Sequence, residues 1–417
     1  MRVIEGIRRR FSFGRLGQNA IVFASGMGAR AMIQAAYLIL LSRWMGPEGY
    51  GYFAGSVAAA VILGPLAGWG VSFLVAGRVG RDPSTMGSMW ATALTQIAFS
   101  GVVLVALVMA ASVGLLDQRV STGAMLMLAV GELIALPVAN VAAGLALAAD
   151  KGPVAAVATC LVPAGRVVSV LLLMLAGSEV SPDLVASMHL LGSVVGAASA
   201  LALMAHIGAR PEWAARLPMI ESATVGFSHA LGTLVGASYQ EIDKVILLQT
   251  VDAATAGAYT VAFRAVALFV LPVTALLAVA VPRLLAAHGN NNEVALRRAI
   301  ARSVVGYAFV AIVAALLAAP LLPAVFGAAY VDASRQMILL VPWIGFFALH
   351  QYLGVRLTTS GRQGARLAIE SAGLLLLLAM NLRWIPSLGT EGAVISLLLA
   401  ETLMILACGW VLARRRQ

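Results

Sequence analysis

Residues 41–81 read LSRWMGPEGYGYFAGSVAAAVILGPLAGWGVSFLVAGRVGR. A charged turn that ends at Glu48 separates one apolar run from the next, and the second run continues to Arg78. Gly64 and Pro65 interrupt that second run at its middle, and proline in a helix interior removes a backbone donor and bends or breaks the helix. The stretch therefore predicts two membrane-spanning helices, the second of them broken.

A similar pattern returns half a chain later, in residues 247–285, LLQTVDAATAGAYTVAFRAVALFVLPVTALLAVAVPRLL. Tyr259 stands where Tyr52 stood and Pro272 where Pro65 stood, both 207 positions later in a chain of 417 residues. Two matches in the same turn, helix and proline context indicate a duplicated bundle. Internal repeats of this kind are a common plan of secondary transporters.

The composition is that of an integral membrane protein. Hydrophobic residues make up 61% of the chain and charged residues 11%, whereas soluble domains carry roughly 25% charged residues. The net charge of +10 comes from cations in short loops between apolar runs, a distribution typical of membrane topology and not of nucleic-acid binding. The 2 cysteines lie inside apolar runs, so the sequence predicts no disulfide framework, no metal site and no cofactor.

A spanning helix needs about 20 predominantly apolar residues. The sequence contains twelve such runs, which predict an all-α membrane protein with about twelve transmembrane helices. The runs cover residues 18–43, 50–77, 86–113, 122–148, 153–176, 184–206, 220–250, 256–282, 300–325, 334–358, 363–383 and 390–413.

A polar link near the middle of the chain predicts two pseudo-symmetric lobes of six helices. With the N-terminus in the cytoplasm, twenty cations fall on the cytoplasmic side and four in outer loops, a strong positive-inside bias that places both termini in the cytoplasm. Two basic stretches, 1–17 and 283–299, suit interfacial helices on anionic lipid, or for the second stretch a solvated linker. The expected parts are a cytoplasmic or interfacial segment 1–17, an N-lobe 18–206, a linker 207–219, a C-lobe 220–413 and a basic tail 414–417.

Apart from cations within three residues of the ends of the runs, four cations lie inside the apolar runs: Arg30, Arg166, Lys244 and Arg264. An ionised group at the bilayer centre costs about 2.5–3.5 kcal/mol on the insertion scale. Each of the four therefore needs an anionic partner or a water-filled cavity.

The first run carries Arg30, Gln34 and Tyr37 at spacings of four and three residues, so they share one helix face. We expect Arg30 and Gln34 to line a central cavity. The alternative is a salt bridge between Arg30 and Glu132 on the fourth run.

The seventh run carries a longer polar stripe, in which His229, Gln240 and Asp243 recur at helical spacing and Lys244 follows directly. Such a stripe is expected to face water or a substrate. A structural pair of Asp243 with Arg264 on the eighth run is the alternative for the outer end of the stripe.

In the fifth run Arg166 follows Pro163 within one turn, and a bend beside a cation suggests a cavity wall. The acids Glu132, Glu370 and Glu401 are candidates for ion coupling, or they neutralise nearby arginines. Prolines that interrupt spanning helices are candidate hinges, at Pro65, Pro137, Pro163, Pro272 and Pro342.

Two segments carry a family resemblance. Residues 45–51, MGPEGYG, and the helix that follows them resemble the first-lobe signature of the Wzx-type polysaccharide transporters, which belong to the MATE/MOP flippase superfamily. Residues 238–285, which begin SYQEIDKVILLQT, look like the second-lobe counterpart, with Asp243 and Tyr259 at the motif positions.

The resemblance implies a MATE-like fold of two six-helix lobes around a central cavity. It implies a flippase that moves an undecaprenyl-pyrophosphate-linked oligosaccharide across the inner membrane by alternating access, for exopolysaccharide, capsule or O-antigen assembly beside polymerase and export machinery. Arg30, Arg166 and Arg264 would give that cavity a cationic interior suited to a pyrophosphate or an acidic sugar.

Two rival functions stay open. A drug or cation antiporter of the same fold is usually organised by buried carboxylates, and a cationic cavity suits cationic drugs poorly. A membrane polysaccharide polymerase or ligase would be favoured by a long outer loop, and no outer loop in this assignment exceeds about a dozen residues. The sequence therefore favours a transporter over an enzyme.

Overall fold

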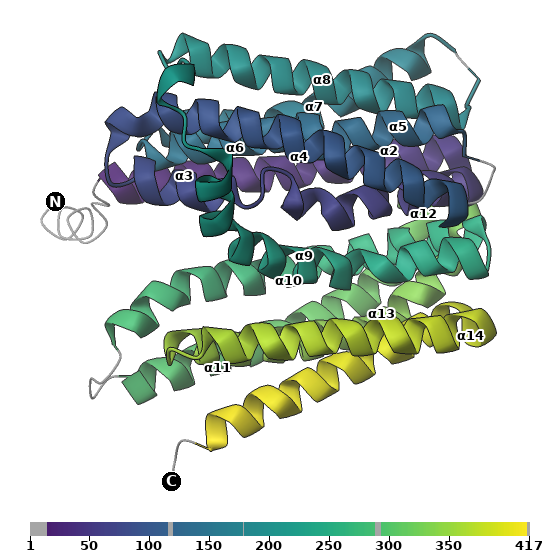
Figure 1. Cartoon of the computed structure of the whole chain (residues 1–417). Helices are drawn as coiled ribbons and strands as arrows, with labels where there is room; N and C mark the ends of the chain where they lie inside the picture. The colour runs from purple at the N-terminus through teal and green to yellow at the C-terminus, as the bar shows by residue number, and fades with distance from the viewer. Residues whose placement is uncertain (1–14, 116–119, 178, 288–292, 415–417) are drawn as a thin grey trace, which may run out of the picture. The chain divides into compact units, whose positions relative to one another are not determined.

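The computed structural model of the chain describes residues 15–115, 120–177, 179–287 and 293–414 (Figure 1). These residues form long helices joined by short turns, and none of them lies in a strand. The fold class is therefore all-α, as predicted.

Nine helical segments within the described ranges are long and apolar enough to cross a membrane. Two of these segments join two helices across a kink, at Gly46 in α2 (Arg15–Leu63) and at Gly389 in α14 (Gln363–Ala413). The kink at Gly46, with φ 69°, lies in the charged turn that the sequence predicts. A further long helix, α9 (Met219–Thr250), carries the predicted polar stripe and stands outside the nine. Together these helices account for the twelve predicted runs.

The chain divides into two compact units. Unit 1 comprises the chain up to Leu40 and residues 63–234. Its elements, besides parts of α2 and α9, are η1 (Gly64–Leu66), α3 (Val71–Val79), η2 (Pro83–Thr85), α4 (Met86–Leu115), α5 (Thr122–Val130), the π-helical η3 (Gly131–Ala135), α6 (Leu136–Ala148), α7 (Gly152–Leu175), α8 (Pro182–His206) and η4 (Trp213–Ala215).

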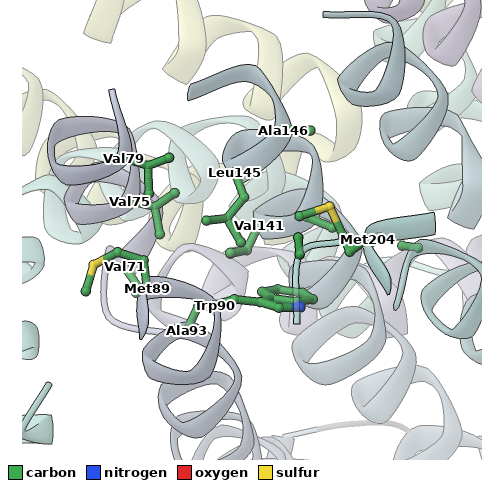
Figure 2. Close-up of a cluster of buried hydrophobic side chains, with 14 of the residues drawn as sticks. Val71, Val75, Val79, Met89, Trp90, Ala93, Val141, Leu145, Ala146 and Met204 are labelled. Atoms are coloured by element: carbon green, nitrogen blue, oxygen red, sulfur yellow. The ribbon is translucent and has the colours of Figure 1, made fainter. Parts of the chain in front are cut away.

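Unit 1 has an apolar core between α3, α4 and α6 (Figure 2). Val71 and Val75 of α3 and Leu145 of α6 pack around the fully buried Trp90 of α4, and Met204 of α8 joins them. This core fixes α3 against the rest of unit 1.

The helix that the sequence predicts to be broken is broken. After α2 ends at Leu63, the short η1 contains Pro65, and Gly68, Trp69 and Gly70 follow with positive φ values of 76°, 47° and 75°. Left-handed backbone favours glycine. Unwound backbone is tolerated at membrane depth only where it is buried in protein or lines a water-filled cavity.

Side chains of α4 bind the unwound backbone. The hydroxyl of Ser100 accepts a hydrogen bond from the N–H of Gly68 at 2.7 Å. The side-chain amide of Gln96 is oriented so that both its nitrogen and its oxygen have partners. It donates to the carbonyl of Gly68 at 3.0 Å and accepts from the hydroxyl of Ser222 at 2.6 Å. The break is therefore a bonded structure that includes the start of α9.

The first half of α9 packs on α3. A Cβ on Gly226 would lie 2.4 Å from the carbonyl oxygen of Trp69, so glycine is required there. The rings of His229 and Phe73 stack with centroids 5.2 Å apart. Unit 1 therefore includes the beginning of α9.

Unit 2 comprises residues 41–62 and 235–417. It contains the second half of α2 and of α9, followed by α10 (Ala253–Ala286), α11 (Glu293–Ala318), η5 (Ala319–Leu321), α12 (Leu322–Phe326), η6 (Ala328–Tyr330), α13 (Val331–Thr359) and α14.

The repeated motif turns meet in unit 2. A Cβ on Gly51 would lie 1.8 Å from the carbonyl oxygen of Ala253, and a Cβ on Gly257 would lie 2.0 Å from that of Pro47. Small residues let membrane helices approach closely. The glycines of both motifs thus hold α2 against α10.

The predicted lobes 18–206 and 220–413 stay a prediction, since the two units are bounded elsewhere, at positions inside α2 and α9. Most of the predicted interfacial segment 1–17 and the middle of 283–299 lie outside the described residues.

Candidate functional site

Arg30 is placed by short polar side chains on two neighbouring helices of unit 1. Its guanidinium donates to Oδ1 of Asn140 on α6 at 3.0 Å and to Oγ1 of Thr159 on α7 at 3.2 Å. Asn140 is exposed and Arg30 is half-buried. Both partners are neutral, so the charge of Arg30 is held in place without being neutralised by them.

Arg166 on α7 lies deeper, and its partner is Glu132. A guanidinium nitrogen of Arg166 lies 2.8 Å from Oε1 of Glu132, and Nε donates to the hydroxyl of Ser193 at 2.8 Å. The second terminal nitrogen of Arg166 is buried and finds no hydrogen-bond partner among the described residues. The alternative pair of Arg30 with Glu132 is therefore wrong, because Glu132 pairs with Arg166.

Glu132 also contacts a histidine that the sequence did not connect to it, and that histidine contacts a tyrosine. Nε2 of His189 on α8 lies 3.1 Å from Oε1 of Glu132, and the hydroxyl of Tyr37 lies 2.8 Å from Nδ1 of the same histidine. The cluster therefore ties α2, η3, α7 and α8 together. His189 carried no predicted role, because the spacing within one helix does not reveal contacts across helices.

The local backbone explains how Glu132 reaches this cluster. It lies in the π-helical segment Gly131–Ala135, just before Pro137, and π-helical turns are frequent at functional sites. A Cβ on Gly192 of α8 would lie 2.6 Å from the Cα of Arg166. That glycine lets α8 approach α7, so the side chains of His189 and Ser193 can meet the cluster.

Unit 1 therefore holds two neighbouring arginines and one carboxylate at membrane depth. Arg30 and Arg166 lie close enough to repel each other, and Glu132 attracts both. Gln34, on the same helix as Arg30, is exposed. The cluster has a surplus positive charge, and its half-buried arginine is beside exposed polar groups, which suits an anion.

The polar stripe of α9 divides in two. His229 and Gln240 are exposed, as a stripe that faces water requires. Asp243 and Lys244 are buried and pair with each other at 3.0 Å, and the Lys244 ammonium lies 3.6 Å from the ring centroid of Phe263. In this structure Asp243 and Lys244 are consequently out of reach of a ligand.

The predicted alternative pair of Asp243 with Arg264 is wrong. Arg264 pairs with Glu241 at 2.7 Å, and Asp243 instead accepts a hydrogen bond from the Tyr259 hydroxyl at 2.7 Å. Glu241 and Asp243 lie two positions apart, on opposite sides of α9, and both sides are packed. The Arg264 side chain remains 39% exposed.

The other two candidate acids differ in their surroundings. Glu370 on α14 pairs with Arg366, four residues earlier, at 2.7 Å. Glu401, later on α14, is fully buried, with His350 of α13 at 3.0 Å. Glu370 therefore has a neutralising arginine, and Glu401 has a histidine.

The predicted hinge prolines fall into two groups. Pro65 lies in the break before α3, and Pro137 follows the π-helical segment. Pro163, Pro272 and Pro342 lie inside α7, α10 and α13, which continue through them. Their role as hinges stays a prediction.

Comparison with known families gives one match. The family described as "Polysaccharide biosynthesis protein" matches residues 16–288, which is more than half of the chain. A comparison with curated proteins found no match.

Solved structures with a similar fold are transporters and flippases rather than enzymes. An inward-facing multidrug resistance MATE family transporter of the MOP superfamily is similar with a TM-score of 0.75 and 16% identity, over 95% of this chain and 98% of that one. The lipid II flippase MurJ, in an inward closed conformation, is similar with a TM-score of 0.72 and 10% identity, over 94% and 87%. A MOP superfamily transporter from Pyrococcus furiosus, described as having a binding pocket of reverse polarity, is similar with a TM-score of 0.63 and 17% identity, over 96% and 95%.

At these identities the likeness establishes the fold. The protein is a multi-pass membrane protein with the fold of the MATE and MurJ transporters of the MOP superfamily, and by its sequence it belongs to the polysaccharide biosynthesis protein family.

Proposed function

We propose that the protein is a flippase that translocates an undecaprenyl-pyrophosphate-linked oligosaccharide from the inner to the outer leaflet of the cytoplasmic membrane. The cargo would serve exopolysaccharide, capsule or O-antigen assembly. The polyprenyl tail stays in lipid while the head group passes through the protein by alternating access. Both termini face the cytoplasm in this proposal.

The surplus positive charge around Arg30 carries the proposal. Arg30 is held by Asn140 and Thr159, which are neutral, while Glu132 pairs with Arg166. A guanidinium offers several N–H donors in a fixed plane, which matches phosphate oxygens. Arg30, with Asn140 beside it, is therefore proposed to bind the pyrophosphate. The exposed polar residues Gln34, His229 and Gln240 are proposed to line the water-accessible route of the head group.

A drug antiporter is the alternative, favoured by the structural likeness to a multidrug resistance transporter. A surplus cation beside exposed polar groups repels cationic drugs, however. The family match to polysaccharide biosynthesis adds to the case for a lipid-linked sugar.

The test is binding of undecaprenyl pyrophosphate to the purified protein in lipid nanodiscs. We expect saturable binding that inorganic pyrophosphate competes away and that weakens when Arg30 is changed to alanine. Arg335→Ala is the control, because Arg335 forms an exposed pair with Glu391. No binding by the wild type, together with saturable binding of a cationic dye, would favour the antiporter.

A further inference from the structure

Glu401 is a carboxylate with no exposure, on the last spanning helix. The indole Nε1 of Trp343 donates to its Oε1 at 3.0 Å, and Nδ1 of His350 lies 3.0 Å from its Oε2. Both ring nitrogens of His350 and Oε2 of Glu401 are buried and make no hydrogen bond in the described part of the chain, so the contact at 3.0 Å has ion-pair distance without hydrogen-bond geometry. The carboxylate of Glu401 and the ring of His350 are therefore shielded from bulk water.

The other buried carboxylates each have a permanently basic partner. Glu132 pairs with Arg166, Glu241 with Arg264 and Asp243 with Lys244, at 2.8, 2.7 and 3.0 Å. Across the residues that the structure describes, the ion-pair contact of Glu401 is His350 alone. A histidine is cationic only when it binds an additional proton.

The two units contain the same pair in opposite order. In unit 1 the fourth predicted run carries the acid, Glu132, and the sixth carries His189. In unit 2 the corresponding tenth run carries His350 and the twelfth carries Glu401.

The predicted run that lies between the acid and the histidine in the sequence contributes a different side chain in each unit. In unit 1 the fifth run supplies Arg166 to the pair. In unit 2 the eleventh run carries Asn381, which is fully buried and whose amide atoms find no hydrogen-bond partner within the described ranges. Glu132 in unit 1 is therefore neutralised by an arginine, whereas Glu401 in unit 2 is not.

The remaining ionisable groups near Glu401 do not replace that cation. Tyr239 on α9 and Cys408 on α14 lie within electrostatic range, and both are neutral in their protonated forms. Asp243, next to Tyr239, is held by Lys244 and Tyr259. The pair becomes electrically neutral only by binding one proton, either as carboxylic acid with imidazole or as carboxylate with imidazolium.

We propose that Glu401 and His350 form a proton-binding site that is occupied in this conformation and gives up its proton in another state of the cycle. Loss of the proton leaves a buried carboxylate without a counter-charge, which is strongly unfavourable in an apolar interior. The deprotonated protein therefore favours a conformation that wets Glu401. The link to translocation rests on the proposed transport function, whereas the site itself does not.

The site is tested without any cargo, by infrared difference spectroscopy of the purified full-length protein in lipid nanodiscs. As the pH is varied we expect a carboxyl band that changes with pH, disappears in Glu401→Gln and changes its pH dependence in His350→Gln. Glu370→Gln is the control and keeps the band, because Glu370 is paired with Arg366. A pH-independent spectrum, or an unchanged band in Glu401→Gln, overturns the proposal. His350→Gln serves as the second variant if Glu401→Gln does not fold.

Coupling is tested with a fluorescent polyprenyl pyrophosphate in vesicles under an imposed pH gradient. One proton per cargo molecule changes the steady-state distribution of the probe by about tenfold per pH unit, and Glu401→Gln removes that dependence while probe binding persists. Arg30→Ala has the converse effect, with weak binding and an unchanged infrared titration. If the wild type does not move the probe, the proposed function fails and the infrared result still decides the proton site. Probe movement that does not depend on the pH gradient would overturn the proposed coupling between proton release and translocation.

Discussion

Arg30 owes its position to two neutral groups, and its geometry should matter as well as its charge. Arg30→Ala would remove the proposed charge-assisted hydrogen bonds to the pyrophosphate, each worth about 1.5–3 kcal/mol, so we expect undecaprenyl pyrophosphate to bind at least about tenfold more weakly. Arg30→Lys keeps the charge but not the planar donor set, so its affinity should lie between those of the wild type and Arg30→Ala. Isothermal titration of nanodisc samples gives the three affinities. Equal affinities for all three would remove Arg30 from the site.

The Glu132 cluster should be needed for folding. Glu132→Ala leaves Arg166 buried without its counter-charge, and breaking a buried pair from one side costs about 3–5 kcal/mol. We expect a large drop in the thermal unfolding midpoint of the detergent-solubilised protein. Glu391→Ala is the matched control: it breaks the exposed pair with Arg335 and should change stability by no more than about 1 kcal/mol. Similar midpoints for the two variants would contradict the structural role of Glu132.

At this scale the sequence predicted which residues are charged within the membrane but not which ones meet. Arg30 was placed on a polar helix face, and its hydrogen bonds to Asn140 and Thr159 agree with a partly open position. The two alternative ion pairs, Arg30 with Glu132 and Asp243 with Arg264, were wrong. The arginines that Glu132 and Glu241 meet depend on how neighbouring helices rotate and pack. Spacing along one helix does not contain that information.

At the scale of elements, the motif glycines are explained by backbone contact. Gly257→Ala would place a methyl group 2.0 Å from the Pro47 carbonyl oxygen, so α2 and α10 would have to separate. Overpacking of this kind usually costs about 1–3 kcal/mol, and sometimes more. Gly144→Ala in α6 is the control, since its methyl group would meet no atom within 4 Å. Thermal unfolding of the two variants tests the contact, and equal midpoints would refute it.

The break before α3 should depend on its hydrogen bonds from α4. Ser100→Ala leaves the buried N–H of Gly68 without its 2.7 Å acceptor, and an unsatisfied buried donor costs about 1–3 kcal/mol. Ser199→Ala on the exposed face of α8 removes only a bond to its own helix. Amide hydrogen exchange should increase near Gly68 in Ser100→Ala and stay as in the wild type in Ser199→Ala. Full protection in both variants would show that Ser100 is dispensable.

The break itself could be predicted from the sequence, because Gly64 and Pro65 act locally on the backbone. The groups that bind the unwound segment could not. Gln96 and Ser100 are ordinary polar residues of an apolar run, and only the packing of α4 against the break gives them partners.

At the scale of the whole molecule, the distribution of cations predicts the topology. Twenty cations against four predict that both termini face the cytoplasm. We expect a green fluorescent protein fused after Gln417 to fluoresce, and alkaline phosphatase fused there to be inactive. The same two reporters inserted at Ser387, in the predicted outer turn before Gly389, should give the opposite pattern. Active phosphatase at the C-terminus would invert the assignment.

Fold class and family followed from hydropathy and from the repeated motif, because both are properties of the chain as a whole. The sequence predicts α9 as the run 220–250, although its polar stripe lowers its apolar character and leaves it outside the nine segments that meet the length and hydropathy criteria in the described residues. The same polar stripe makes the exposed residues of α9, His229 and Gln240, candidates for the path of the head group.

The most direct test of the central claim is mass spectrometry of lipid extracts from cells that lack this protein and retain the upstream glycosyltransferases. The flippase account predicts that an undecaprenyl-pyrophosphate oligosaccharide builds up, protected from a membrane-impermeant probe. It also predicts that the wild-type protein clears the lipid, whereas Arg30→Ala does not. An unchanged lipid profile with normal surface polymer and new sensitivity to cationic toxins would contradict the account.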